Sequence, residues 1–177
     1  SRLFFVLHPL HVFLSALVTT GVFKLYTFRS RWAQLFLIGY VGAVGVATIS
    51  DCIIPFLTES LLGLPNRGLH IGVVEKPILT NFAAVLGILT AAIKPSTKFP
   101  HFGHVLISTW ASMFHIIMAM GTVLSLGTMI MVAVFLFIAV WLPCCLSDIV
   151  FPLLFVAHKG KENGINSSYE NKKMRFT

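Results

Sequence analysis

The stretch AQLFLIGYVGAVGVATISDCIIPFL, at residues 33–57, decides the fold of this chain. Its only charged residue is Asp51. An α-helix needs roughly 20 predominantly apolar residues to cross the hydrocarbon core of a bilayer. The stretch therefore predicts a transmembrane helix with one carboxylate inside the membrane. Such a group needs a partner or a role, because an isolated charge at that depth is costly.

The whole chain shares this apolar character. Hydrophobic residues make up 56% of the sequence and charged residues 11%, with 16 phenylalanines and a mean hydropathy of +0.88. Soluble domains average about 25% charged residues. We therefore expect an all-α polytopic membrane protein whose first partner is the lipid bilayer.

Apolar runs along the sequence predict about five transmembrane helices. The first ends at residue 23 and begins at residue 3 or 9, and the others lie at residues 33–57, 77–93, 104–124 and 127–157. Together they form a single transmembrane domain at residues 1–157, followed by a polar tail at residues 158–177 whose composition predicts disorder. Pro143 lies inside the fifth run and should kink or break that helix.

The basic residues predict the orientation of the chain in the membrane. Ten of the 13 Lys and Arg residues fall between the first and second runs, between the third and fourth, or in the tail, whereas three fall on the opposite side. Short loops rich in Lys and Arg stay in the cytoplasm. We expect an integral membrane protein with an extracytoplasmic N-terminus and a cytoplasmic C-terminus.

Charge and cysteine usage argue against two other classes of protein. The net charge of +7 does not indicate nucleic-acid binding, because the basic residues lie in loops and tail without interleaved aromatic platforms or a groove-reading motif. The three cysteines, at positions 52, 144 and 145, lie inside apolar runs without CxxC spacing, which argues against a disulfide framework.

Two short phrases occur twice in the chain. The phrase HxxHVxxS stands at residues 8–15 and 101–108, and the phrase SDxxxP stands at residues 50–55 and 147–152. The order is the same both times, with 43 residues from His8 to Asp51 and 47 from His101 to Asp148. Asp51 and Asp148 are the only aspartates in the chain.

This repetition predicts an internal inverted repeat of two helices. One copy covers residues 3–57 and the other residues 99–157, with a linker and the third span at residues 58–93 between them. With an odd number of spans, the two copies face opposite sides of the membrane. Inverted repeats with polar groups at their interface are the architecture of many secondary transporters.

Each copy carries the residue types of a metal site. Histidines at i and i+3 lie on one face of a helix, and two imidazoles with a carboxylate suit divalent transition metals of the zinc, iron or manganese class. The aspartate would be a ligand, or a partner that orients a histidine. Pro55 and Pro152 each follow an aspartate by four residues, so each should free that aspartate's carbonyl group from the helix.

We therefore expect an outer and an inner metal site. The connection at residues 64–76 adds His70 and Glu75 to the outer site, because loops held by a rigid scaffold often carry function. Cys144 and Cys145 could make the inner ligand set softer. The predicted metal residues are His8, His11, Asp51, His70 and Glu75 outside, and His101, His104 and Asp148 inside.

These sites favour a small membrane transporter or channel for divalent metal ions, present as a homodimer because five short spans make a thin bundle. One alternative is an intramembrane metal-dependent enzyme in which Ser15, Ser108 or Glu75 assists an activated water. Another is a structural or cofactor-holding subunit of a larger membrane complex. The chain contains none of the common nucleotide-binding or hydrolase motifs.

Overall fold

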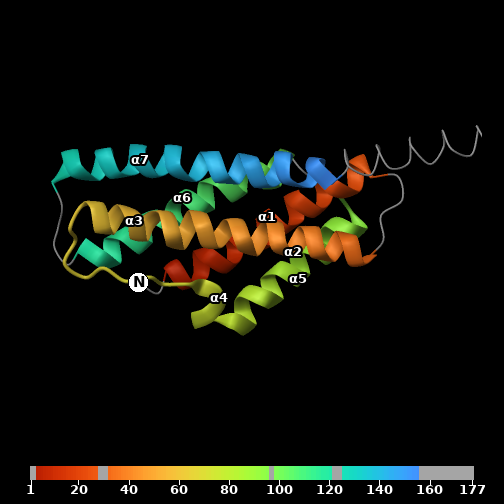
Figure 1. Cartoon of the computed structure of the whole chain (residues 1–177), viewed down its shortest axis with the longest axis horizontal. Helices are drawn as coiled ribbons and strands as arrows, with labels where there is room; N and C mark the ends of the chain where they lie inside the picture. Colours follow the sequence, from red (N-terminus) through yellow and green to blue (C-terminus); the bar gives the residue numbers. More distant parts are fainter. Residues whose placement is uncertain (1–2, 28–31, 96–97, 121–124, 156–177) are drawn as a thin grey trace, which may run out of the picture.

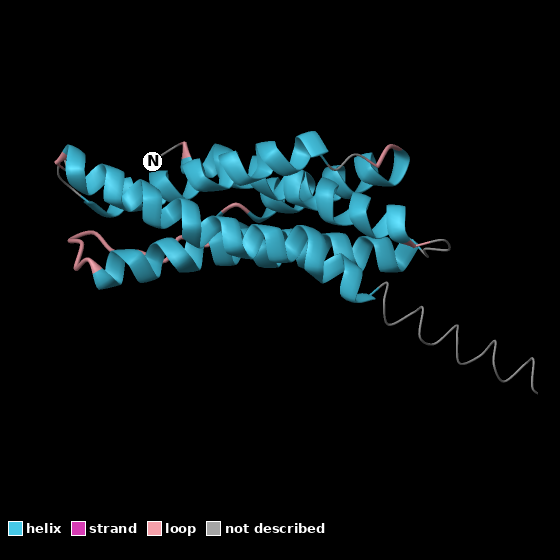
Figure 2. Cartoon of the chain, turned by 90° about the horizontal axis from the view of Figure 1, so that it is seen from above, coloured by secondary structure: helices cyan, strands magenta, loops and turns pink. Residues whose placement is uncertain are grey.

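A computed structural model describes residues 3–27, 32–95, 98–120 and 125–155 of the chain. Within these ranges it describes only the backbone at residues 98–100, 128, 131, 138–139, 142, 145 and 147–148. The described residues form helices joined by short loops and contain no strand, so the all-α prediction is confirmed (Figure 2).

The helices follow the predicted apolar runs closely. The run at residues 77–93 coincides with one helix, and the run at residues 33–57 becomes three consecutive helical pieces that form one continuous rod (Figure 1). In chain order the elements are α1 (Phe4–Tyr26), α2 (Trp32–Thr48), the π-helix η1 (Ile49–Ile53), α3 (Ile54–Leu61), α4 (Gly72–Glu75), α5 (Pro77–Ile93), α6 (Lys98–Met120), α7 (Leu126–Cys145) and the π-helix η2 (Leu146–Val150).

Three helical segments among the described residues are long and apolar enough to cross a membrane. They are Phe4–Tyr26, Trp32–Leu61 and His101–Met120, and Pro77–Ile93 is apolar but shorter. Large apolar side chains such as Leu37, Phe82 and Ile93 are exposed on the outside of the bundle. A hydrophobic exterior of this kind favours contact with lipid rather than water.

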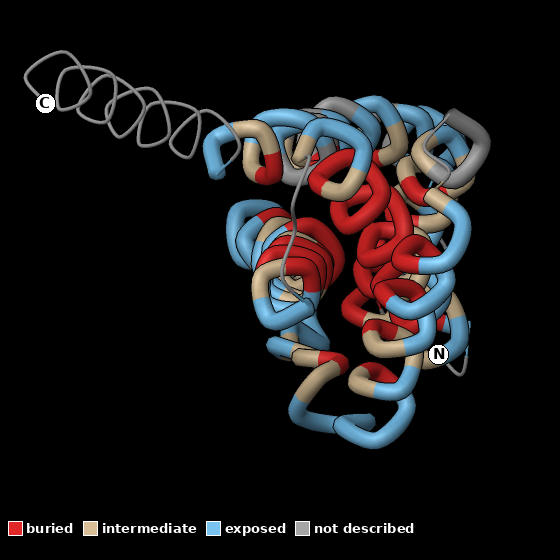
Figure 3. Tube along the Cα trace, turned by 90° about the vertical axis from the view of Figure 1, so that its right-hand side faces the viewer, coloured by how far each residue is buried: buried red, intermediate tan, exposed pale blue. Residues whose placement is uncertain are grey.

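α1 is the central helix of the bundle. It packs against α2, α5 and α6, and every residue from Ser15 to Phe23 is buried. The buried residues gather where the helices face one another (Figure 3). A helix that is apolar on all sides is stable only when neighbours surround it, which explains this position.

Small residues let the helices approach closely. A Cβ atom added at Gly87 of α5 would meet the backbone carbonyl of Phe13 and the side chain of Ala16 in α1. A Cβ atom added at Gly39 of α2 would meet Thr20 of α1. Small residues at helix interfaces are the usual packing device in membranes, and here they allow α5 and α2 to lie close against α1.

Both SDxxxP phrases adopt π-helix. η1 ends two residues before Pro55, and η2 ends two residues before Pro152. A proline ring clashes with the carbonyl group four residues earlier and supplies no N–H group to it, and the wider π turn accommodates that loss. Pro143, by contrast, lies inside α7 without ending the helix.

Candidate metal centre

The carboxylate of Asp51 lies at the centre of a buried polar cluster. Its Oδ2 accepts hydrogen bonds from Nδ1 of His8 at 3.0 Å and from Nδ1 of His11 at 2.7 Å. Its Oδ1 accepts hydrogen bonds from the hydroxyls of Ser50 at 2.9 Å and Ser108 at 2.7 Å. All five residues are at most 1% exposed, so the carboxylate is hydrogen-bonded to four protein donors in place of water.

Three elements hold this arrangement. His8 and His11 are one turn apart on α1, and η1 turns Asp51 toward them. Ser108 reaches the carboxylate from the middle of α6. The hydroxyl of Ser112, also on α6, donates to the backbone carbonyl of Ser50 at 3.0 Å, so α6 is tied to the π turn at two points.

The hydrogen bonds determine which nitrogen of each histidine carries the proton. An ionised carboxylate can only accept hydrogen bonds, so Nδ1 of His8 and Nδ1 of His11 must both be donors. In a neutral imidazole the other nitrogen, Nε2, then has a free lone pair. Nε2 of His11 is buried and has no hydrogen-bond partner among the described residues. A lone pair in that position is available to bind a metal ion.

Two further ligand groups lie beside His11. The imidazole of His104 stacks on that of His11 with 4.6 Å between ring centroids and 23° between planes. Ligand atoms of His11, His104 and Cys144 all lie within 4.8 Å of one another, and the three side chains are buried. We call these three residues the central cluster. Ligands of a tetrahedral zinc ion are roughly 3.5 Å apart. The two nearly parallel imidazole rings would have to turn out of their stack for all three residues to bind one ion.

Asp51 has the geometry of an orienting group rather than a ligand. A carboxylate offers about four lone-pair positions, and four donors already occupy those of Asp51. A carboxylate that accepts from the far nitrogen of a metal-binding histidine fixes its tautomer and raises its basicity. Of the two roles expected for Asp51, the geometry favours this one.

No known protein family matches the chain, and no curated protein or solved structure does. The chemistry of the central cluster must therefore be inferred from its own residues.

The structure brings His104 to the site where His11 lies, which corrects the expectation of two separate sites for these residues. The prediction placed each histidine pair at the membrane face where its helix begins. Instead α1 and α6 pack with their histidine-bearing turns at the same depth, so His11 and His104 stack. Helix stagger is set by side-chain packing and cannot be read from the spacing of motifs.

The remaining predicted residues lie around this centre. His101 is partly exposed, with its ring centroid 6.1 Å from that of His104. His70 and Glu75 form an ion pair of 2.8 Å in the segment between α3 and α5. The side chains of Asp148 and Cys145 lie outside the described part of the structure, although both positions belong to helices.

Sequence reasoning missed Glu59 as a functional candidate. Glu59 is fully buried, and its Oε1 accepts a hydrogen bond from Nδ1 of the buried His115 at 2.7 Å. The sequence does carry a signal for it: Glu59 is a carboxylate beside an apolar run, and Asp51 was singled out because it is a carboxylate within one. The predicted span ended at Leu57, whereas the helical rod continues to Leu61. Because the predicted boundary was four residues too early, Glu59 was assigned to the loop.

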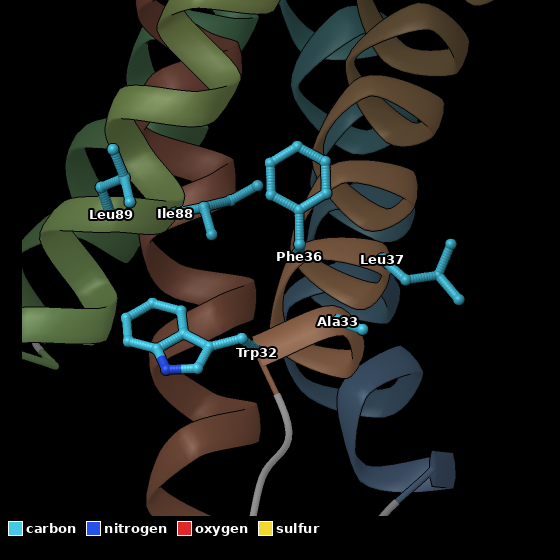
Figure 4. A pocket seen from close by; sticks show the side chains of 6 residues that line it. All are labelled: Trp32, Ala33, Phe36, Leu37, Ile88 and Leu89. Carbon is cyan, nitrogen blue, oxygen red and sulfur yellow. The ribbon is translucent and has the colours of Figure 1, made fainter.

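A hollow on the surface of the bundle offers no ligands of its own. It has a volume of about 580 Å³, lies between α2 and α5, and is lined by Trp32, Ala33, Phe36, Leu37, Ile88 and Leu89 (Figure 4). These side chains carry no charge. The hollow therefore suits contact with lipid chains and is not a metal site.

Proposed function

We propose that this protein is a small membrane transporter or channel for divalent transition-metal ions, and that it holds the ion in the central cluster. The observation that carries the proposal is that the ligands come from both sequence copies. His11 belongs to the first copy, whereas His104 and Cys144 belong to the second. In transporters built from inverted repeats, ion sites lie near the bilayer midplane at the interface of the repeats.

The position of Asp51 supports a site at that depth. Asp51 is ten residues from the end of the helical segment Trp32–Leu61, and Ser108 is near the middle of α6, Lys98–Met120. Each helix has enough length on either side of Asp51 or Ser108 to reach the two faces of a bilayer. The proposal therefore keeps the five-span inverted repeat, an extracytoplasmic N-terminus and assembly as a homodimer.

The ligand set favours zinc within the expected class of ions. Two imidazoles and a thiolate suit borderline-soft ions, whereas magnesium and calcium prefer oxygen ligands. Three protein ligands leave a fourth position of a tetrahedral ion for water. An incompletely enclosed ion can be released, and transport requires release as well as binding.

Charge balance explains why a buried carboxylate would be retained here. A divalent cation in an apolar bundle is strongly unfavourable unless negative groups lie close to it. A Cys144 thiolate and the Asp51 carboxylate, one contact further away through His11, would together supply two negative charges. Without an ion, Asp51 still accepts its four hydrogen bonds, so the site is stable both with and without an ion.

Elemental analysis of the purified protein, combined with zinc uptake by reconstituted vesicles, tests the proposal. His11→Ala and Cys144→Ser should each lose one zinc ion per chain and should abolish uptake. Cys52→Ser is the matched control, because Cys52 is also a buried free cysteine but lies outside the central cluster. Equal zinc content in wild type, His11→Ala and Cys144→Ser would contradict the proposal.

A further inference from the structure

A second group of ionisable side chains lies between the segment after α3 and the C-terminal part of α6. It consists of Glu59, His70, Glu75 and His115, which we call the loop cluster. Glu59 and His115 are 0% exposed, whereas the side chains of His70 and Glu75 are 39% and 35% exposed. The loop cluster thus extends from the protein surface into the bundle.

Each histidine of the loop cluster is oriented by its own carboxylate. Nδ1 of His115 donates to Oε1 of Glu59 at 2.7 Å, and Nδ1 of His70 donates to Oε1 of Glu75 at 2.8 Å. As at Asp51, a proton on Nδ1 leaves the lone pair on Nε2. Nε2 of His115 is buried and has no hydrogen-bond partner among the residues the structure describes.

The two imidazoles are spaced as a shared ion requires. Their ring centroids are 5.4 Å apart, with 64° between the planes. A metal ion at about 2.0 Å from a nitrogen of each ring, in tetrahedral geometry, would put the centroids roughly 5 Å apart. A purely structural Glu59–His115 pair would join α3 to α6, but it would not account for a second carboxylate–histidine pair beside it.

We propose that His70 and His115 form a second transition-metal site. This loading site takes up the ion at the end of the bundle where α1 begins and supplies it to the central cluster. Glu75 and Glu59 act as positioning residues for the two imidazoles. The side chains of His70 and Glu75 are more than one-third exposed, so an ion can reach the site from outside the bundle. Water supplies the remaining ligands, which keeps the ion exchangeable.

The loading role rests on the proposed transport function, because the ion bound by His70 and His115 would be passed on to the central cluster. Phe4 lies between His115 and His8: its ring stacks on that of His8 with 5.5 Å between centroids and meets that of His115 edge-on at 5.1 Å. His8 and His11 share the carboxylate of Asp51. An ion released from His115 would therefore pass the apolar ring of Phe4 and then His8 before it reaches His11 of the central cluster.

Zinc titration of the purified full chain in detergent micelles tests this site. Wild type should bind two Zn²⁺ ions per chain. His70→Ala should bind one. Glu59→Gln should lower the affinity for the ion that His70→Ala loses by about 10- to 100-fold, the usual effect of losing an orienting carboxylate. Leu69→Ala is the matched control, because Leu69 is an exposed neighbour of His70 without a ligand atom, and it should bind two ions.

The double variant His11→Ala/Cys144→Ser separates this inference from the proposed function. It should retain the ion that His70→Ala loses. If wild type binds only the ion that the double variant loses, or if His70→Ala still binds two ions, the loading site does not exist. If wild type binds only the ion that His70→Ala loses, the site at His70 stands and the central cluster fails as a metal centre.

Discussion

The hydroxyl of Ser108 lies 2.7 Å from Oδ1 of Asp51, so the serine of the second HxxHVxxS phrase binds the aspartate of the first copy. The two copies are therefore joined through their repeated residues. Ser15 holds the corresponding position in the first copy and is fully buried. Its hydroxyl has no hydrogen-bond partner among the described residues.

Replacing Ser108 by alanine should destabilise the protein. The substitution removes one of four donors from a buried carboxylate, and an unsatisfied buried acceptor costs about 1–3 kcal/mol or more when it is charged. Denaturation of the purified protein in detergent measures the change. Ser60→Ala is the control, since Ser60 is exposed and donates only to Phe56 in its own helix, and it should change stability little. Equal stability of the two variants would show that Ser108 does not support the carboxylate.

Gly87 should be intolerant of a methyl group, whereas Gly45 should accept one. An alanine Cβ atom at position 87 would meet the backbone of α1, which cannot rotate away, but nothing lies within 4 Å of the same atom at position 45. Gly45→Ala should stabilise its helix by about 0.5–1 kcal/mol. Gly87→Ala should separate α5 from α1 and lower the melting temperature. Melting curves of both variants check the helix contact, and a neutral Gly87→Ala would argue against it.

Much of the helix map could be predicted from the sequence, because a helix in lipid needs a long apolar run and little else. The helix Pro77–Ile93 has the predicted bounds, and the breaks before Pro55 and Pro152 follow from proline geometry. The grouping of His8 and His11 with Asp51 was also expected, and the structure shows it.

The contact between His11 and His104 could not be predicted in this way. It depends on how far α1 and α6 are shifted along each other, and the packing of side chains between these two helices sets that shift. The roles of Ser50 and Ser112 were hidden for a related reason. Serine is common in membrane helices as a packing residue, so only the three-dimensional neighbours reveal its hydrogen-bond partners.

Labelling of single introduced cysteines should place the two ends of the bundle on opposite sides of the membrane. Cysteine at Ser60, at the end of α3, should react with an impermeant reagent from outside. Cysteine at Lys94, just after α5, should react only from the cytoplasm. Both positions are exposed, whereas the native Cys52 and Cys144 are buried. Reaction of both positions from one side would mean that Pro77–Ile93 does not cross the membrane. The prediction of an inverted repeat would then be wrong.

The two aspartates should be equally necessary for transport. In an inverted-repeat transporter the two copies exchange roles between the outward-open and inward-open states, so each state needs the carboxylate that orients the histidines of one copy. Asp51→Asn and Asp148→Asn should therefore both abolish zinc flux in reconstituted vesicles. The amide keeps nearly the same shape but removes the negative charge, so the loss would be electrostatic in origin.

An enzyme would respond differently to the same two substitutions, because catalysis needs only one competent site. In that case Asp51→Asn should be fatal to activity, whereas Asp148→Asn should mainly lower stability. Each variant is first checked for its fold and oligomeric state by gel filtration and thermal melting, so that a misfolded protein is not read as an inactive one. Full flux with a folded Asp148→Asn would rule out exchange between the copies. The buried Asp51 cluster would then be better explained as a single-sided metal enzyme or as the anchor of a larger membrane complex.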